Sequence, residues 1–141
     1  MKLVCSHCHA INELPAERLG DGPVCGKCKQ GLLPPKPIER NAQNFDHFSQ
    51  HSELPVIMDF WAAWCGPCRA MAPQFAEAAG RMQTRVLFAK LDTEAAQPVA
   101  ARLGIRSIPT LILFTRGQEI NRISGACRAD ELIAWLKPQL A

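Results

Sequence analysis

The sequence predicts an α/β fold in which a mixed central β-sheet is covered by helices on both faces and is preceded by a small separate module. Two observations carry this prediction. From about residue 38 onward, short apolar runs of strand length alternate with segments of helical period. Before residue 33, four cysteines stand in two pairs among mostly polar residues. With 141 residues, of which 48% are hydrophobic and 21% charged, the chain suits a domain of about 100 residues with an appendage.

The N-terminal cysteines follow a metal-binding spacing. They form the pattern C-x2-C-x16-C-x2-C, which is typical of a zinc site, at Cys5, Cys8, Cys25 and Cys28. Each pair occupies a tight turn that aims two sulfurs at one point, and Gly26 suits the unusual backbone angles of such a turn. Because residues 1–32 hold few large apolar side chains, metal binding would supply their folding free energy. We expect a zinc-ribbon-like module with one structural zinc. Iron, or four free or disulfide-linked thiols, are the alternatives.

A proline-rich stretch separates this module from the rest of the chain. Residues 33–37 read Leu-Pro-Pro-Lys-Pro, with three prolines in four positions. Prolines so close together resist helix formation and favour a stiff, extended connector. We therefore assign residues 1–32 to the metal-binding module, residues 33–37 to a linker and residues 38–141 to the main domain.

The first elements of the main domain follow from its apolar patterns. A helix is expected at residues 44–51, where two phenylalanines share one face, and a buried strand at residues 54–60. The period of residues 65–80, with Ala, Met and Phe on one side, predicts a helix after that strand. Residues 86–91 are a second apolar strand, and residues 95–103 a short helix interrupted near its proline.

The last elements complete the sheet. Residues 110–115 and 119–123 have the character of strands, and Arg116-Gly117 between them predicts a turn. Residues 128–140 follow as a final helix with an apolar side. Strand, helix and strand followed by a hairpin and a helix imply both parallel and antiparallel pairing within one sheet.

The run WCGPC at residues 64–68 stands at the start of the helix predicted after the first strand. Two cysteines three positions apart at a helix start can close a small disulfide ring. Unpaired N–H groups and the helix dipole stabilise an anion there, and a thiolate is the species that attacks disulfides. The pattern predicts thiol–disulfide exchange, with Cys65 as the more exposed nucleophile and Cys68 as the thiol that releases the reduced substrate. A structural disulfide, or half of a metal site, is the alternative.

Asp59 is an acid inside an apolar strand. The alternation of side chains along the strand places it on an inward face, where desolvation raises the pKa of a carboxyl group. An acid tipped toward solvent at the strand end is the other interpretation.

Further residues match, in order and at the same spacing, the pattern of a known family: Asp59-Phe60-Trp61-Ala62-Ala63 before the WCGPC run, and Pro73, Lys90, Ile108-Pro109-Thr110, Gly117 and Gly125 after it. Residues 38–141 therefore resemble the thioredoxin family. With the four-cysteine module added, the whole chain resembles its zinc-binding branch, the thioredoxin 2 type. The resemblance implies a thioredoxin fold and the reduction of disulfide-containing protein substrates. It also implies that electrons arrive from NADPH through thioredoxin reductase.

Roles for individual residues also come from the resemblance. Asp59 would accept the proton of Cys68, with Lys90 tuning its charge. The Ile108–Pro109 bond would be cis and would place backbone beside the reactive cysteine, where a substrate chain can pair with it. The substrate-binding surface would comprise Trp64, Gly66, Pro67, Ile108, Pro109, Thr110, Gly125 and Ala126.

Some cysteines and histidines lie outside these motifs. Cys127 is the unpaired seventh cysteine, either a small apolar loop residue or a regulatory thiol. His47 and His51 lie four apart on a predicted helix, as metal-binding pairs do, but no third ligand accompanies them, so a solvated face is the simpler interpretation. His7 and His9 flank Cys8 and could replace a cysteine as ligands.

Charge and motifs argue against several functions. Residues 1–40 hold six basic against four acidic side chains, and residues 41–141 ten against nine, so a nucleic-acid partner is not expected. The chain lacks a bilayer-spanning run and the apolar stretch of a signal peptide, so we expect a cytoplasmic monomer without membrane contact. Without a phosphate loop or dinucleotide motif, no organic cofactor is expected and a reductase must supply electrons. Two other hypotheses are a protein-recruiting docking module and a sensor whose oxidised thiolates release zinc.

Overall fold

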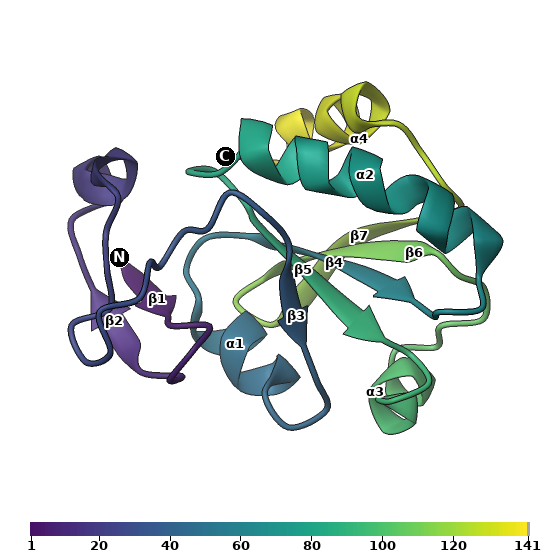
Figure 1. Cartoon of the computed structure of the whole chain (residues 1–141), viewed down its shortest axis with the longest axis horizontal. Coiled ribbons are helices and arrows are strands. Elements are labelled where there is room, and N and C mark those ends of the chain that lie inside the picture. Colours follow the sequence, from purple (N-terminus) through teal and green to yellow (C-terminus); the bar gives the residue numbers. More distant parts are fainter. Residues whose placement is uncertain (141) are drawn as a thin grey trace.

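The computed structural model describes residues 1–140, and its centre is a five-stranded mixed sheet (Figure 1). The strand order is β3-β5-β4-β6-β7. Pairing is parallel among β3, β5 and β4, whereas β6 runs antiparallel to β4 and β7 antiparallel to β6. The strands are β3 (Ile38–Arg40), β4 (Val56–Trp61), β5 (Leu87–Asp92), β6 (Thr110–Thr115) and β7 (Gln118–Ser124).

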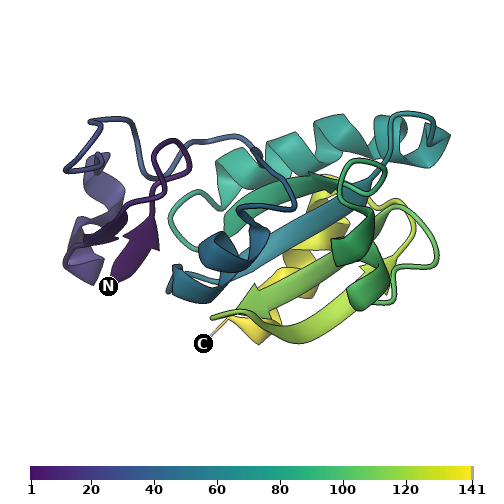
Figure 2. The ribbon, with the colours of Figure 1, turned by 90° about the horizontal axis from the view of Figure 1, so that it is seen from below.

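Helices cover both faces of this sheet, as the sequence predicts. One face carries α2 (Gly66–Arg81) and α4 (Ala129–Leu136). A short 3-10 helix, Lys137–Gln139, directly follows α4. The other face carries α1 (Phe45–His51) and α3 (Gln97–Arg102), as Figure 2 shows from below. The predicted α/β class with a mixed sheet is therefore confirmed.

Two apolar cores form because successive side chains of a strand point to opposite faces. In β4, Val56, Met58 and Phe60 pack in the core beneath α1 and α3, whereas Ile57 packs in the core beneath α2 and α4. By the same alternation Asp59 faces α2 and α4. The WCGPC run at the start of α2 and the buried acid of β4 thus belong to the same side of the sheet.

The N-terminal module contains regular structure of its own. Strands β1 (Lys2–Val4) and β2 (Ile11–Glu13) pair in antiparallel fashion, and a 3-10 helix follows at Ala16–Asp21. The module lies at one end of the sheet beside α1 (Figures 1 and 2). Its side chains Leu3 and Val4 are buried in the core beneath α1. The metal-binding module and the main domain therefore share one apolar core.

Several details differ from the sequence prediction. The edge strand β3 was not expected, because its three residues lie next to the prolines and two of them are charged. Pro98 does not interrupt α3 but lies in its first turn. An N–H at that position would have no partner within the helix, so proline loses nothing there, and its fixed φ suits a helix start. The last helix ends at Leu136 rather than Leu140. None of the helices in residues 1–140 combines the length and the apolar character that a membrane span requires.

Candidate functional site

The WCGPC run forms the N-terminus of α2. Cys65 is the N-cap residue of the helix, and Pro67 lies in the first turn, a position that proline favours. Cys65 and Cys68 form a disulfide with their Cα atoms 5.2 Å apart. The backbone N–H of Cys68 donates a hydrogen bond to Cys65 Sγ at 3.1 Å, so the sulfur fills the place of the oxygen in an ordinary N-cap.

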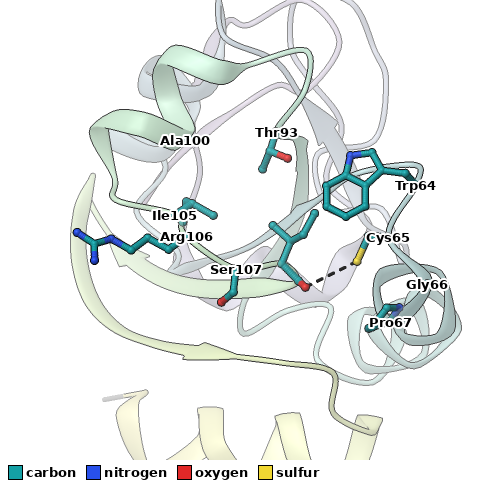
Figure 3. A pocket seen from close by; sticks show the side chains of 10 residues that line it. Trp64, Cys65, Gly66, Pro67, Thr93, Ala100, Ile105, Arg106 and Ser107 are labelled. Carbon is teal, nitrogen blue, oxygen red and sulfur yellow. Dashed lines mark hydrogen bonds between the residues drawn. The ribbon is translucent and has the colours of Figure 1, made fainter.

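A cleft of about 450 Å³ opens beside this disulfide (Figure 3). Cys65 lines it, and Cys68 is not among its lining residues. The Trp64 side chain stands at the cleft with 67% of its surface exposed, and its indole N–H donates to Glu94 Oε1 at 2.8 Å. An apolar surface of this kind, beside a reactive sulfur, suits a protein substrate that carries a disulfide.

The opposite wall of the cleft is the segment that leads into β6. Ile108 O lies 3.7 Å from Cys65 Sγ, a contact that Figure 3 marks with a dashed line. A disulfide sulfur carries no proton, so this contact becomes a hydrogen bond only when Cys65 is a thiol. The Ile108–Pro109 bond is cis, which confirms the expectation from the resemblance. Gly125 has φ of +94°, which favours glycine, and its N–H donates to Pro109 O at 2.8 Å.

Asp59 lies on the face of the sheet that is covered by α2, the helix at whose start the disulfide stands. Its exposed fraction is 1%, and its Oδ1 has no hydrogen-bond partner within residues 1–140. Burial raises the pKa of Asp59 to about 7, and the opposite charge of Lys90 reduces that rise. Lys90 is the direct neighbour of Asp59 in the pairing of β4 with β5. A carboxyl group of this pKa can hold or release a proton at neutral pH.

Four sulfurs converge in the N-terminal module. Within residues 1–140, the group of side chains close enough to hold a metal ion is Cys5, Cys8, Cys25 and Cys28, whose sulfurs all lie within 4.8 Å of one another. The sulfurs of Cys5 and Cys28 lie 3.5 Å apart, and those of Cys8 and Cys25 lie 3.6 Å apart. These distances are close to the separation of about 3.8 Å that a tetrahedral ion with Zn–S bonds of about 2.3 Å would impose.

The two cysteine turns repeat the same geometry. Cys5 Sγ accepts from the His7 N–H at 3.4 Å, and Cys25 Sγ accepts from the Lys27 N–H at 3.4 Å. Hydrogen bonds from the backbone N–H of Cys28 and the side chain of Asn12 lower the pKa of Cys25, whereas burial and the neighbouring sulfurs raise the pKa of Cys28. Four sulfurs this close together share protons when no ion is bound, and a metal would replace those protons. The donor set therefore fits a closed tetrahedral metal site.

The unusual backbone angles occur elsewhere than predicted. Positive φ occurs at His9 and at Lys29, one residue after the second cysteine of each pair. Gly26 has an ordinary φ, and its N–H donates to Asn12 Oδ1 at 2.8 Å. The left-handed residue stands at the end of the turn, directly before Gln30, whose carbonyl accepts from the Cys25 N–H. The prediction that Gly26 supplies the unusual angles was therefore wrong.

Comparison with known proteins gives the family. The family model named Thioredoxin matches residues 36–138. The chain belongs to the thioredoxin family. A second model, described as Thioredoxin 2, N-terminal, matches residues 4–30. Together with the Cys65–Cys68 disulfide, family membership makes the protein a thiol–disulfide oxidoreductase, and the predicted resemblance is confirmed.

Relatives extend over most or all of this thioredoxin. Thioredoxin C-3 of Corynebacterium nephridii is 51% identical over 140 residues, which cover 99% of this chain and 96% of that protein. Thioredoxin M-type, chloroplastic, of Chlamydomonas reinhardtii is 44% identical over 105 residues, 72% of this chain and 75% of that protein. Thioredoxin of Synechocystis sp. is 44% identical over 89 residues, 63% of this chain and 83% of that protein.

One expectation about this thioredoxin site was wrong. Cys65 was expected to be more exposed than Cys68, yet the exposed fractions are 3% and 4%. Trp64 and Ile108 line the cleft together with Cys65, and Ile108 O lies 3.7 Å from the Cys65 sulfur. The difference between the two sulfurs is therefore one of position, because Cys65 alone lines the cleft.

The predicted substrate-binding residues are not all in one place. Trp64, Gly66, Pro67 and Ile108 line the cleft. Thr110 is buried, and its hydroxyl donates to Ser107 O at 2.6 Å, so it braces the cleft wall from behind. Ala126 lies instead at a smaller cavity of about 190 Å³ that Cys127 also lines.

Several residues that line the cleft were not predicted from the sequence. Besides the predicted residues, the cleft is lined by Thr93, Ala100, Ile105, Arg106 and Ser107. The last three directly precede Ile108-Pro109, and this proximity in the chain was the signal available. Thr93 and Ala100 come from the loop after β5 and from α3, and nothing in the sequence connects them with the WCGPC run.

The remaining candidate residues have structural surroundings. Burial raises the pKa of the half-buried Cys127 thiol, and the charges of Glu131 and Asp59 add to that rise, so the thiol stays protonated. His47 Nε2 lies 2.9 Å from His9 O, and its ring packs beside His51 with centroids 5.0 Å apart. His47 therefore contributes to the contact between α1 and the metal-binding module, and His51 packs against it on the exposed side of the helix.

Proposed function

We propose that the protein reduces disulfides of other proteins with its Cys65/Cys68 dithiol and is recharged by thioredoxin reductase and NADPH. The observation that carries the proposal is the disulfide at the start of α2, which borders an open, largely apolar cleft. A structural disulfide has no need of such access. The same proposal places the protein in the cytoplasm, where reductants keep dithiols reduced.

In the first step, the thiolate of reduced Cys65 attacks one sulfur of a substrate disulfide. A bond forms between Cys65 Sγ and that sulfur, the substrate S–S bond breaks, and the other substrate sulfur leaves as a thiolate that takes a proton from water. The N–H of Cys68, 3.1 Å from Cys65 Sγ, and the N-terminus of α2 stabilise the attacking anion.

In the second step, Asp59 accepts the proton of Cys68. The Cys68 thiolate attacks Cys65 Sγ, the mixed disulfide breaks, and the remaining substrate sulfur leaves as a thiolate. Two electrons have then passed to the substrate, and the protein carries the Cys65–Cys68 disulfide. The pKa of Asp59, raised to about 7 by burial, supports this role, and Lys90 tunes it.

Substrate chains would bind in the cleft as short extended segments. Ile108 presents backbone beside the reactive sulfur, and strand-like pairing with it would align the substrate disulfide. Pro109 and Thr110, both buried, would hold this backbone in place. The apolar contacts in the cleft would come from Trp64, Gly66 and Pro67. Gly125 and Ala126 lie outside the cleft lining and would touch only a substrate that extends beyond it.

The four N-terminal cysteines would hold one zinc ion in a structural role. When bound, the ion links the two cysteine turns and so stabilises the module that packs against α1. The chemistry of the disulfide step takes place wholly on residues of the main domain. We propose that the protein acts as a monomer on protein substrates, without nucleic acid or membrane.

The test is reduction of insulin disulfides by the full chain with NADPH and a bacterial thioredoxin reductase. We expect turnover that Cys65→Ser abolishes and that Cys127→Ala, the matched control, leaves intact. Turnover with dithiothreitol but not with the reductase would contradict the electron source alone. Absence of Cys65-dependent turnover with either reductant would contradict the proposed function.

A further inference from the structure

Three ionisable side chains lie in one row across the sheet. Glu39 of β3 is the direct partner of Lys90 in β5, and Lys90 is the direct partner of Asp59 in β4. Directly paired residues of parallel strands point to the same face, and neighbouring strands lie about 4.8 Å apart. Lys90 therefore stands between two carboxyl groups, on the face that α2 and α4 cover.

Burial changes steadily along this row. Asp59 is 1% exposed, Lys90 is half-buried, and Glu39 is exposed at the edge of the sheet, where β3 is the outermost strand. Beyond Asp59 the row continues with Leu111 and Ile123, which are apolar. The three ionisable residues thus occupy the half of the row nearest β3, and Glu39 is the one exposed to solvent.

The Lys90 ammonium bonds tightly to neither carboxylate. Its Nζ lies 4.9 Å from the centroid of the Trp61 ring, a cation–π contact. Within residues 1–140, no ion pair of 4.0 Å or less joins Lys90 to Asp59 or to Glu39. Asp59 Oδ1 also lacks a hydrogen bond. A closer approach of the ammonium would stabilise the Asp59 carboxylate and make it a weaker base.

We propose that Glu39 is a positioning residue for the second step, because its carboxylate draws the Lys90 ammonium toward the sheet edge and leaves Asp59 basic enough to take the Cys68 proton. This inference rests on the proton-acceptor role given to Asp59 under the proposed function. Glu39 itself touches neither the substrate nor the reacting sulfurs.

The charges around the row agree with this assignment. Lys90 lowers the pKa of both carboxyl groups, and the negative charge of Glu39 raises the pKa of Asp59. From the segment before α4, the Cys127 thiol lies within range of the Asp59 charge, which raises its pKa. On α2, Cys68 is held in the disulfide and carries no charge in the oxidised protein. Although Glu39 is exposed at the sheet edge, the side chains packed around its carboxyl group partly desolvate it and so raise its pKa.

Two further charges act on Glu39, and both have other partners. Arg40 follows it in β3, but its guanidinium donates to Ser6 O at 2.8 Å on the opposite face of the strand. Asp92 accepts the Glu94 N–H at 2.9 Å. Lys90 is thus the cation that Glu39 and Asp59 share.

The test is the variant Glu39→Gln, which removes the charge and keeps the shape. Carboxyl carbon NMR on the full, metal-loaded chain would follow the Asp59 titration in the oxidised protein. We expect its midpoint to fall by about half a pH unit or more. Glu39→Asp, which keeps the negative charge, should leave the Asp59 midpoint close to its wild-type value. Glu17→Gln, an exposed change of the same charge in the N-terminal module, should leave the Asp59 midpoint unchanged.

The kinetic arm follows release of substrate from a mixed disulfide on Cys65 as a function of pH. In Glu39→Gln the midpoint of this profile should move to lower pH with the NMR midpoint, and the rate at high pH should fall about twofold because the base is weaker. An unchanged Asp59 titration, or an equal shift in Glu17→Gln, would overturn the proposal. A shifted titration with an unshifted kinetic profile would overturn the proton-acceptor role of Asp59, and the proposal with it. Insulin turnover that persists in that case would leave the disulfide-reductase function standing.

Discussion

The backbone N–H of Cys68 points at the sulfur of Cys65, 3.1 Å away. The same residue that supplies the second thiol therefore also supplies a donor to the first. When the disulfide opens, this N–H and the N-terminus of α2 remain beside Cys65 and favour its thiolate. Cys68 lies one turn further into the helix and outside the cleft, so the two cysteines differ in reactivity although they are almost equally buried.

This asymmetry predicts selective alkylation. Reduced protein treated with limiting iodoacetamide at pH 7 should lose Cys65 first, by at least tenfold over Cys68, because the thiolate is the reactive species and only Cys65 lines the cleft. Peptide mass spectrometry measures the ratio. Equal labelling of the two cysteines would contradict the assignment of Cys65 as nucleophile.

The substitution Asp59→Asn should slow the second step more than the first. Asparagine fills the same space but cannot take the Cys68 proton, so the mixed disulfide should persist, with its resolution slowed about 100-fold. Stopped-flow measurement of substrate capture and of product release separates the two steps. If both steps slow equally, Asp59 acts on the site as a whole and not on Cys68.

Asp59 also predicts how stability depends on pH. Its pKa in the folded protein is about 7, above the ordinary carboxyl value of 3.8, so the folded state binds the proton more tightly than the unfolded state. The free energy of unfolding should therefore fall as pH rises from about 4 to about 7, by on the order of 4 kcal/mol from this group. Asp59→Asn should remove that decline. Urea unfolding at pH 4.5 and at pH 8 provides the comparison, and equal destabilisation of the wild type and the variant would argue against a buried, raised Asp59.

Loss of the metal should weaken the main domain as well as the module. Leu3 and Val4 share the core beneath α1, and each such buried side chain is worth about 1.5–3 kcal/mol. Cys25→Ser should lower the zinc content from one ion per chain and the free energy of unfolding by about 3 kcal/mol. Metal analysis and urea unfolding measure the two effects, with Cys127→Ser as the matched cysteine control. Full stability in a metal-free Cys25→Ser protein would contradict the shared-core argument.

The parts of the fold that could be predicted are those with strong local patterns. The helices and strands near Cys65 follow from apolar period, and both cysteine motifs follow from spacing alone. The strand β3 could not be predicted, because three residues with two charges carry no period, and only pairing with Lys90 and its neighbours makes them a strand. Its residue Glu39 was missed for the same reason.

Contacts between distant segments were equally beyond the sequence. Nothing in the pattern says that Leu3 meets the core of the main domain, or that Arg40 reaches Ser6 in the first cysteine turn. The cleft beside Cys65 likewise combines Trp64 with the segment that precedes β6, more than 40 residues further along the chain. The cis bond before Pro109 was implied by family resemblance and not by any local preference.

The most direct test of the central claim is to trap the first intermediate. Cys68→Ser, incubated with a disulfide-containing protein such as insulin, should accumulate a covalent adduct, because the second thiol that would release it is missing. Peptide mapping should place that adduct on Cys65, and dithiothreitol should release it. An adduct on Cys127 or on the N-terminal cysteines, with Cys65 free, would contradict the account.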